Sequence, residues 1–273
     1  MDSLVTNGVL LNRKTLSILN NLGVTNLTIR IDSANSSAMD ALRGKGTFKR
    51  IIYNAGQAIK MGFKVFFSTT VCKLNFREID KMIGLAKEIN AVNLSLDHIF
   101  YHGRSICYAD ILKLSPEEER EALFKINELS HTFGSYITGD YVRQIDFIKI
   151  LEKNMLGKKY ICIDTCGAGN KQIFIRSDGW VAPCPAMRNI KLGNINERSL
   201  TEIWGDVERF DFFRRSFCLD LVKFHDCKSC IYQELCYTRC RCYPYFLPTG
   251  FSDKSFYCIV PGGSTEPIFK FKA

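Results

Sequence analysis

Eight of the ten cysteines in the last 112 residues form a pattern that constrains this chain more than any other feature. They are Cys162, Cys166, Cys184, Cys227, Cys230, Cys236, Cys240 and Cys258. The densest part reads Cys-x2-Cys-x5-Cys-x3-Cys, a spacing that lets thiolates of one short segment converge on a shared centre. Eight thiolates satisfy two four-coordinate sites, and soft sulfur ligands select zinc or iron–sulfur clusters. The pattern therefore predicts a metal-binding C-terminal part.

The rest of the sequence indicates the cellular compartment of the protein. No uninterrupted apolar run is long enough to span a membrane, and the start, Met1-Asp2-Ser3, lacks the basic and apolar regions of a signal peptide. We expect a cytoplasmic protein without a membrane partner. In that compartment twelve cysteines indicate metal ligands or free thiols, not a disulfide framework.

Composition and charge exclude some partners. Hydrophobic content is 46% and charged content 24%, as in ordinary globular proteins, and the net charge is +9. Lys and Arg are scattered without a basic run, which predicts no nucleic-acid partner. Eight thiolates holding two clusters would carry about −4 together, leaving roughly +5. A mildly cationic surface suits a peptide with an acidic leader.

The first half alternates between strand and helix patterns. Strands are expected at 4–8, 24–32, 64–71 and 92–96, and helices at 13–22, 47–61 and 76–89. Thr47 is the expected N-cap of the second helix. This order of elements predicts an α/β fold with a parallel sheet.

The sequence after residue 100 contains a clear helix start and a clear hairpin turn. Ser115, Pro116 and Glu118 predict a capping box and a helix that runs to about residue 131, ended by Gly134. Residues 135–160 are expected to hold a last strand and a helical bridge. Ser177-Asp178-Gly179 predicts a hairpin between strands at 173–176 and 180–182, and 200–217 is expected to be helical.

The cysteine pattern resembles the SPASM domain of radical S-adenosylmethionine (SAM) enzymes. The resemblance rests on Cys166-x12-Gly179-x4-Cys184, the dense cysteine run, the last cysteine, and the segments Asp178-Gly179, Pro183-Cys184-Pro185 and Gly193-Asn194-Ile195. It implies two auxiliary 4Fe–4S clusters. Cys166, Cys184 and Cys240 would bind the first, with Cys162 as its fourth ligand. Cys227, Cys230, Cys236 and Cys258 would bind the second.

Other interpretations of the cysteines stay open. Spacing alone does not separate zinc from iron–sulfur, so a zinc-ribbon-like domain is an alternative, and disulfides are a weaker one. Cys72 and Cys107 have the character of core thiols, Cys218 is unassigned, and Cys242 could substitute for Cys240.

The first half is similar to the radical SAM partial (β/α) barrel. The resemblance is carried by the Thr6-Asn7-Gly8 turn, Ile31-Asp32-Ser33, Leu42-Arg43-Gly44 and Ser68-Thr69-Thr70, which follow or end the expected strands. Ligands bind at the carboxyl ends of strands in such folds. The resemblance implies SAM contacts from Thr6, Asn7, Asp32, Arg43 and Thr70. Each of these residues could instead serve only as a turn or cap residue.

The sequence contains no Cys-x3-Cys-x2-Cys motif, which holds the catalytic cluster in radical SAM enzymes. We expect an N-terminally incomplete barrel, from a truncated frame, a late start or a degenerate gene; the rival is a separate polypeptide that supplies the first strands. The expected domains are a partial barrel at 1–135, a bridge at 136–160, a SPASM domain at 161–260 and a tail at 261–273.

Two functional hypotheses follow. The first is a SPASM-containing oxidoreductase that matures a ribosomal peptide, with a flavodoxin or ferredoxin as reductant; SAM and a third 4Fe–4S cluster would bind only to a complete protein, and this chain alone would not cleave SAM. The second is a non-catalytic iron–sulfur or zinc protein that binds a peptide or partner chain. The catalytic residues and the substrate are not identified by the sequence.

Overall fold

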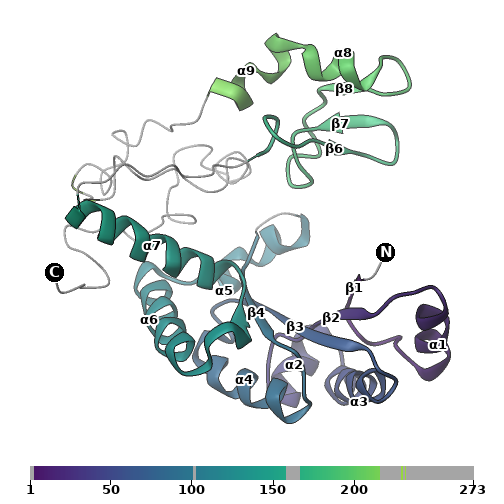
Figure 1. The fold of residues 1–273 in the computed structure, drawn as a ribbon, viewed down its shortest axis with the longest axis vertical. Helices are drawn as coiled ribbons and strands as arrows, with labels where there is room; N and C mark the ends of the chain where they lie inside the picture. The colour runs from purple at the N-terminus through teal and green to yellow at the C-terminus, as the bar shows by residue number, and fades with distance from the viewer. Residues whose placement is uncertain (1–2, 101–102, 158–166, 216–228, 230, 232–273) are drawn as a thin grey trace. The chain divides into compact units, whose positions relative to one another are not determined.

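A computed structural model describes residues 3–100, 103–157, 167–215, 229 and 231 of the chain (Figure 1). The chain divides into two compact units. The first comprises 1–100 and 107–147, and the second comprises 101–106 and 148–273.

The first unit is built on a five-stranded parallel sheet in the order β1-β2-β3-β4-β5. Its strands are β1 (Ser3–Thr6), β2 (Asn26–Arg30), β3 (Lys64–Val71), β4 (Leu94–His98) and β5 (Ile137–Thr138). The spatial order follows the sequence order, as expected when each parallel strand is reached by a short crossover. The predicted α/β class, the parallel sheet and the four strands before residue 100 are confirmed.

Helices alternate with these strands. They are α1 (Arg13–Asn21), α2 (Ser36–Arg43), α3 (Thr47–Lys60), η1 (Phe76–Glu78), α4 (Ile79–Glu88), η2 (Gly103–Tyr108), α5 (Ala109–Leu112), α6 (Pro116–Phe133), η3 (Gly134–Tyr136) and α7 (Asp140–Gly157). Leu27, Ile29 and Phe67 of the sheet are fully buried. The apolar faces of the helices cover them and supply Ile51, Ile83 and Leu123 to the core.

Two helix starts test the predicted caps. Ser115 and Glu118 form the predicted capping box of α6. Thr47 as the N-cap of α3 is wrong, because Thr47 is the first helical residue and follows Gly46. The side chain of Asp40 supplies the missing acceptor, since it binds the backbone N–H of Gly46 at 2.7 Å and of Phe48 at 2.9 Å.

Helix α2 was not expected from the sequence. It begins after Asn35, whose Oδ1 accepts hydrogen bonds from the backbone N–H groups of Ser37 and Ala38. The helix has only eight residues, which is too short for a clear hydrophobic periodicity in the sequence. Its start depends on the single cap residue Asn35. The expected strand at 92–96 is shifted by two residues, to Leu94–His98.

The second unit contains the predicted hairpin and one further strand. β6 (Phe174–Ile175) and β7 (Trp180–Ala182) pair antiparallel around Asp178 and Gly179, and β8 (Gly193–Asn194) pairs with β7. Gly179 has φ +82°, and a Cβ there would lie 2.6 Å from Oδ1 of Asn194. The turn therefore requires glycine.

Two short helices complete the described part of this unit. α8 (Leu200–Gly205) starts at a capping box of Ser199 and Glu202, and α9 (Val207–Arg215) follows after Asp206. They pack on the hairpin through one apolar cluster: Val181, Met187, Leu192, Ile203, Phe210 and Phe213. Across the ranges that the structure describes, no helix has the length and apolar character needed to cross a bilayer.

Candidate functional site at the carboxyl edge of the sheet

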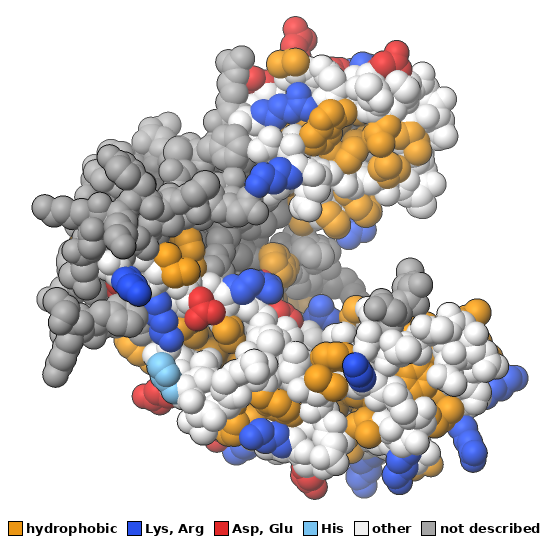
Figure 2. All heavy atoms as spheres, viewed as in Figure 1, with side chains coloured by type: hydrophobic (Ala, Val, Ile, Leu, Met, Phe, Trp, Pro, Cys, Tyr) orange, Lys and Arg blue, Asp and Glu red, His pale blue; other side chains and the backbone are white. Residues whose placement is uncertain are grey.

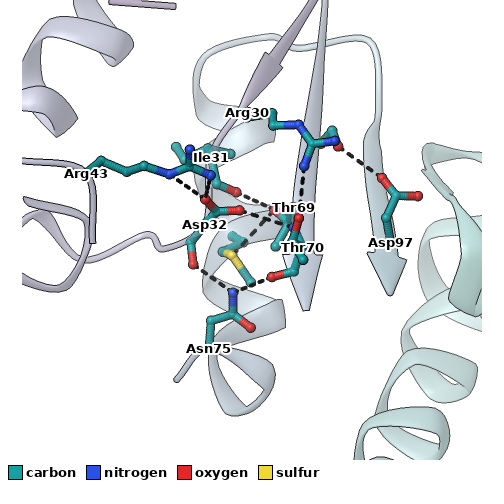
Figure 3. A network of polar contacts seen from close by, with 10 residues as sticks. Arg30, Ile31, Asp32, Arg43, Thr69, Thr70, Asn75 and Asp97 are labelled. Atoms are coloured by element: carbon teal, nitrogen blue, oxygen red, sulfur yellow. Dashed lines mark hydrogen bonds and ion pairs between the residues drawn. The ribbon is translucent and has the colours of Figure 1, made fainter. Parts of the chain in front are cut away.

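The ends of β2 and β3 bring polar side chains together at one edge of the sheet. β2 pairs in register with β3 up to Arg30 and Ser68, and β3 continues to Val71, so the residues that follow β2 lie beside the last residues of β3. Figure 3 shows Asp32, Thr70 and Asn75 turned toward one another, with Arg43 reaching them from the end of α2. This edge is where ligands bind in open α/β folds and barrels.

Asp32 is the centre of this network and is only 6% exposed. Its Oδ2 accepts from Nε of Arg43 at 2.9 Å and from Nη2 of the same guanidinium, and its Oδ1 accepts from the backbone N–H of Thr70 at 3.2 Å. A buried carboxylate needs such charged and hydrogen-bonded partners. The structure thus joins three of the predicted site residues directly.

Asn75 holds the same edge together, a role that was not predicted from the sequence. Its Nδ2 donates to the backbone oxygens of Asp32 and Thr70, each at 2.9 Å, and its Oδ1 accepts from the N–H of Cys72 at 2.8 Å. All polar atoms of this buried amide are used. Its position in the loop after β3 offered no sequence signal, since Asn is common in turns.

Arg30 adds an exposed cation to the edge. Its Nη1 donates to Oγ1 of Thr70 at 3.0 Å. Next to it, Oγ of Ser68 donates to Oδ2 of Asp97 on β4 at 3.0 Å (Figure 3). The carboxyl edge of the sheet therefore carries a positive charge on Arg30 and a negative charge on Asp97.

Thr6 and Asn7 lie at the end of β1 and organise its turn. Oγ1 of Thr6 accepts from the N–H of Gly8 at 3.1 Å, and Oδ1 of Asn7 accepts from the N–H of Val9 at 3.2 Å. Thr6 pairs in register with Ile29 of β2, so the turn belongs to the same edge. These two side chains bond within their own turn, whereas Asp32 accepts hydrogen bonds from both Arg43 and Thr70.

A second polar cluster adjoins the end of β4. Nε2 of His98 lies 2.6 Å from Oε1 of Gln144, and Nδ1 lies 3.5 Å from Oε1 of Glu119 on α6. Burial raises the pKa of Glu119 to about 7, opposed by a hydrogen bond from Tyr141. The ring of Tyr141 packs on His98 with 3.9 Å between centroids. These residues lie on three different elements, so their contacts were not predicted from the sequence.

The thiol of Cys72 is a core group, as expected. It is buried at the end of the β3 segment, and burial, together with the charge of Asp32, raises the pKa of the thiol. A raised pKa keeps sulfur protonated and poorly suited to metal binding. Cys107 is exposed, contrary to the expectation of a core thiol.

Cys184 is the one predicted metal ligand within the described residues. It is half-buried, lies between Pro183 and Pro185, and packs against the apolar cluster of the second unit. Its carbonyl accepts from the N–H of Met187 at 3.1 Å, which fixes the turn that carries the thiol. The other seven predicted ligands, from Cys162 and Cys166 to Cys258, lie outside the described residues. Within the described ranges no three His, Cys, Asp or Glu side chains gather into a metal-sized group.

The described structure is a partial (β/α) barrel with a polar carboxyl edge, followed in the same chain by a cysteine-rich unit. Residues 166–231 match the SPASM iron–sulfur cluster-binding domain. In sequence and fold the chain is similar to radical SAM/SPASM proteins.

Two curated relatives illustrate the similarity. The AdoMet-dependent heme synthase of Methanosarcina barkeri is 29% identical over 95% of this chain and 74% of its own length. The PqqA peptide cyclase of Rhizobium meliloti is 24% identical over 88% of this chain and 61% of its own length. The chain thus spans about three fifths to three quarters of these relatives.

Solved structures show the same fold. Streptococcus suis SuiB bound to the precursor peptide SuiA superimposes with a TM-score of 0.66 at 16% identity, over 94% of this chain and 58% of SuiB. The anSMEcpe protein with bound AdoMet and a peptide gives a TM-score of 0.60 at 20% identity, over 88% of this chain and 65% of that one.

Proposed function

We propose that this chain binds two auxiliary 4Fe–4S clusters as the cluster-carrying part of a peptide-modifying oxidoreductase. The observation that carries the proposal is the match of residues 166–231 to a cluster-binding domain, on a sequence with all eight cysteines of that pattern. The first cluster takes Cys162, Cys166, Cys184 and Cys240. The second takes Cys227, Cys230, Cys236 and Cys258.

The chemistry of the donors fits iron–sulfur clusters. Eight thiolates make two complete four-sulfur sets, and Cys184 stands on a turn fixed by two prolines and one backbone hydrogen bond. The apolar cluster behind Cys184 excludes water on one side, which tunes the potential of a bound cluster. Bound clusters supply one-electron transfer and an anchoring point for substrate.

The carboxyl edge of the sheet is the proposed SAM site, with Thr6, Asn7, Asp32, Arg43 and Thr70 around it. The carboxylate of Asp32 is already occupied by Arg43 and Thr70. Its role is therefore to hold the guanidinium and the end of β3 in place. Thr70 can still donate its hydroxyl hydrogen, because Oγ1 accepts from Arg30.

The substrate is proposed to be a peptide or small protein. PqqA peptide cyclase and SuiB bound to a precursor peptide both resemble this chain, which supports a peptide partner.

An external one-electron donor, a flavodoxin or ferredoxin, would reduce the clusters. Domain limits near residues 135, 160 and 260 remain part of the proposal.

By itself the chain is proposed not to cleave SAM. Cleavage needs an iron with an open site, which a Cys-x3-Cys-x2-Cys motif provides, and no cysteines of this sequence have that spacing. The same observation favours the alternative function, a non-catalytic iron–sulfur or zinc protein that binds a partner.

The test is an anaerobic assay of 5′-deoxyadenosine from SAM with a strong reductant. We expect no product from residues 1–273. Product should form when a segment carrying Cys-x3-Cys-x2-Cys is fused or added as a second chain, and failure of every such addition would favour the non-catalytic alternative. Multiple turnovers by the chain alone, abolished by Cys162→Ala, would contradict the assignment of that cysteine to a closed auxiliary site.

A further inference from the structure

Most of the net positive charge of this protein comes from its first 64 residues. Residues 1–64 contain nine Lys or Arg and three Asp or Glu, so six of the nine net positive charges lie in less than a quarter of the chain. The cations are separated along the sequence and form no basic run. The fold gathers them, because this stretch makes α1, α2, α3 and the first strands of one unit.

The acids of this stretch do not neutralise its surface. Asp32 is buried and pairs with Arg43. Asp40 accepts from the N–H groups of Gly46 and Phe48, and these bonds, helped by the charge of Lys49, lower its pKa. Asp2 lies outside the described residues. Both described acids are thus committed to local structure.

The remaining cations are exposed and form no ion pair with a described carboxylate. No Asp or Glu within the described residues lies at ion-pair distance from Arg13, Lys14, Lys45, Lys49, Arg50, Lys60 or Lys64. Elsewhere in the unit, Lys73, Lys81 and Lys125 each have a carboxylate partner. The contrast marks the first 64 residues as an unbalanced cationic surface.

Helix α3 presents an ordered part of that surface. Ile51, Ala55 and Ala58 of α3 are buried against the sheet, so the opposite face points to solvent. That outer face carries Lys49, Arg50, Tyr53 and Lys60, and Tyr53 is 66% exposed. An exposed aromatic ring between cations is typical of the central residues of protein interfaces.

Helix α1 extends the same surface. It packs beside α3 and exposes Lys14 together with Ile18 (50%) and Leu22 (71%). Figure 2 shows Lys and Arg side chains gathered over the α1 and α3 part of the first unit. The surface formed by these side chains is called the α1/α3 face below.

We propose that the α1/α3 face is the docking site of a small acidic electron-carrier protein. The charge of the face requires an acidic partner, and Tyr53, Ile18 and Leu22 supply the apolar contacts that a folded protein surface buries. The electron-carrier identity rests on the proposed function, since cluster chemistry requires an external donor.

A nucleic acid fits the face less well. Protein–nucleic acid interfaces are dominated by phosphate contacts and are more polar and more positively charged than interfaces between proteins. The exposed aliphatic side chains of Ile18 on α1 and of Leu22 at its C-cap contribute nothing to phosphate binding. They are useful contacts for a protein.

The test is a binding titration of the full chain with a flavodoxin and with a small ferredoxin. The test variant is Lys49→Glu/Arg50→Glu/Lys60→Glu. The control, Lys81→Glu/Lys153→Glu/Arg188→Glu, makes the same change of net charge on exposed residues of other elements. Tyr53→Ser tests the apolar centre of the face. Circular dichroism and iron content show that each variant is folded and loaded.

The expected result is binding of at least one carrier that weakens between about 0.05 M and about 0.3 M NaCl. The test variant should lose about tenfold or more in affinity, and the control about twofold or less. Tyr53→Ser should weaken binding without changing its salt dependence.

Four outcomes would overturn the proposal: no binding of either carrier, equal losses in the test and control variants, equally tight binding of a polyglutamate peptide, or tighter binding of duplex DNA that the test variant abolishes. Normal iron content without docking would reject this inference and leave the proposed function standing. Loss of iron in the unmodified chain would reject the function instead.

Discussion

Arg43 donates through its guanidinium to the carboxylate of Asp32 and thereby ties the end of α2 to the loop after β2. Asp32 is 6% exposed, so its charge is stabilised chiefly by this pair and by the N–H of Thr70. The pair organises the carboxyl edge of the sheet, where the SAM site is proposed.

Breaking either half of this pair should destabilise the first unit. Arg43→Ala and Asp32→Ala should each lower the free energy of unfolding by about 2–3 kcal/mol, because each leaves a polar group without its partner. In the double variant the losses should fall short of their sum by about 1–3 kcal/mol. The measurement is urea unfolding followed by circular dichroism, with the exposed Asp110→Ala as control. Strictly additive losses would show that the two side chains are not coupled.

Glu119 should make stability depend on pH. Its pKa is about 7 in the folded protein and near 4.5 when exposed, so the folded state holds the proton more tightly between these values. The free energy of unfolding should therefore fall as the pH rises from about 4.5 to about 7 and level off above that range.

Glu119→Gln should remove that slope. The variant should gain about 1–3 kcal/mol relative to the unmodified chain between pH 5 and pH 8. Glu128→Gln, an exposed site on the same helix, should leave the slope unchanged. The measurement is urea unfolding at both pH values, and identical slopes in the two variants would contradict the role of Glu119.

Gly139 should tolerate no side chain. It joins β5 to α7 with φ +105°, and a Cβ there would lie 2.4 Å from the carbonyl oxygen of Leu96 on β4. Gly139→Ala should cost about 3 kcal/mol or more. Gly84→Ala, on α4 with open space around it, should be neutral or stabilising by up to about 1 kcal/mol. Equal thermal midpoints for the two variants would contradict this account.

Cysteine substitutions should separate ligands from core thiols. Cys230→Ala removes a proposed ligand and should reduce both iron content and the solubility of the C-terminal half, because metal binding contributes folding energy. Cys72→Ala removes only a buried thiol and should cost modest packing energy. Iron analysis of the soluble fractions checks this, and equal losses would refute the assignment.

The hydrophobic periodicity of the sequence, together with its cap and turn residues, predicted most of the fold. The Ser115 capping box and the Asp178-Gly179 hairpin were found because each depends on residues close in sequence. The cap of α3 was missed because its acceptor, Asp40, lies on the preceding helix. Helix α2 was missed because a helix of eight residues has too few turns for its hydrophobic periodicity to be detected.

The site was predictable only in part for the same physical reason. Asp32 follows β2 and Thr70 lies near the end of β3, and strand ends meet at one edge, so their proximity could be predicted. Arg43 reaches them from the end of α2. The bridging role of Asn75, the pairing of Arg30 with Thr70 and the contact of His98 with Glu119 depend on side-chain directions. The cationic α1/α3 face was also hidden, because its residues converge only after the helices pack.

The central claim is that the cysteines hold iron–sulfur clusters, and the most direct test is metal analysis with Mössbauer spectroscopy of anaerobically reconstituted protein. The account predicts brown protein with about eight irons per chain, all in 4Fe–4S clusters. Colourless protein that retains stoichiometric zinc and takes up no iron would contradict it.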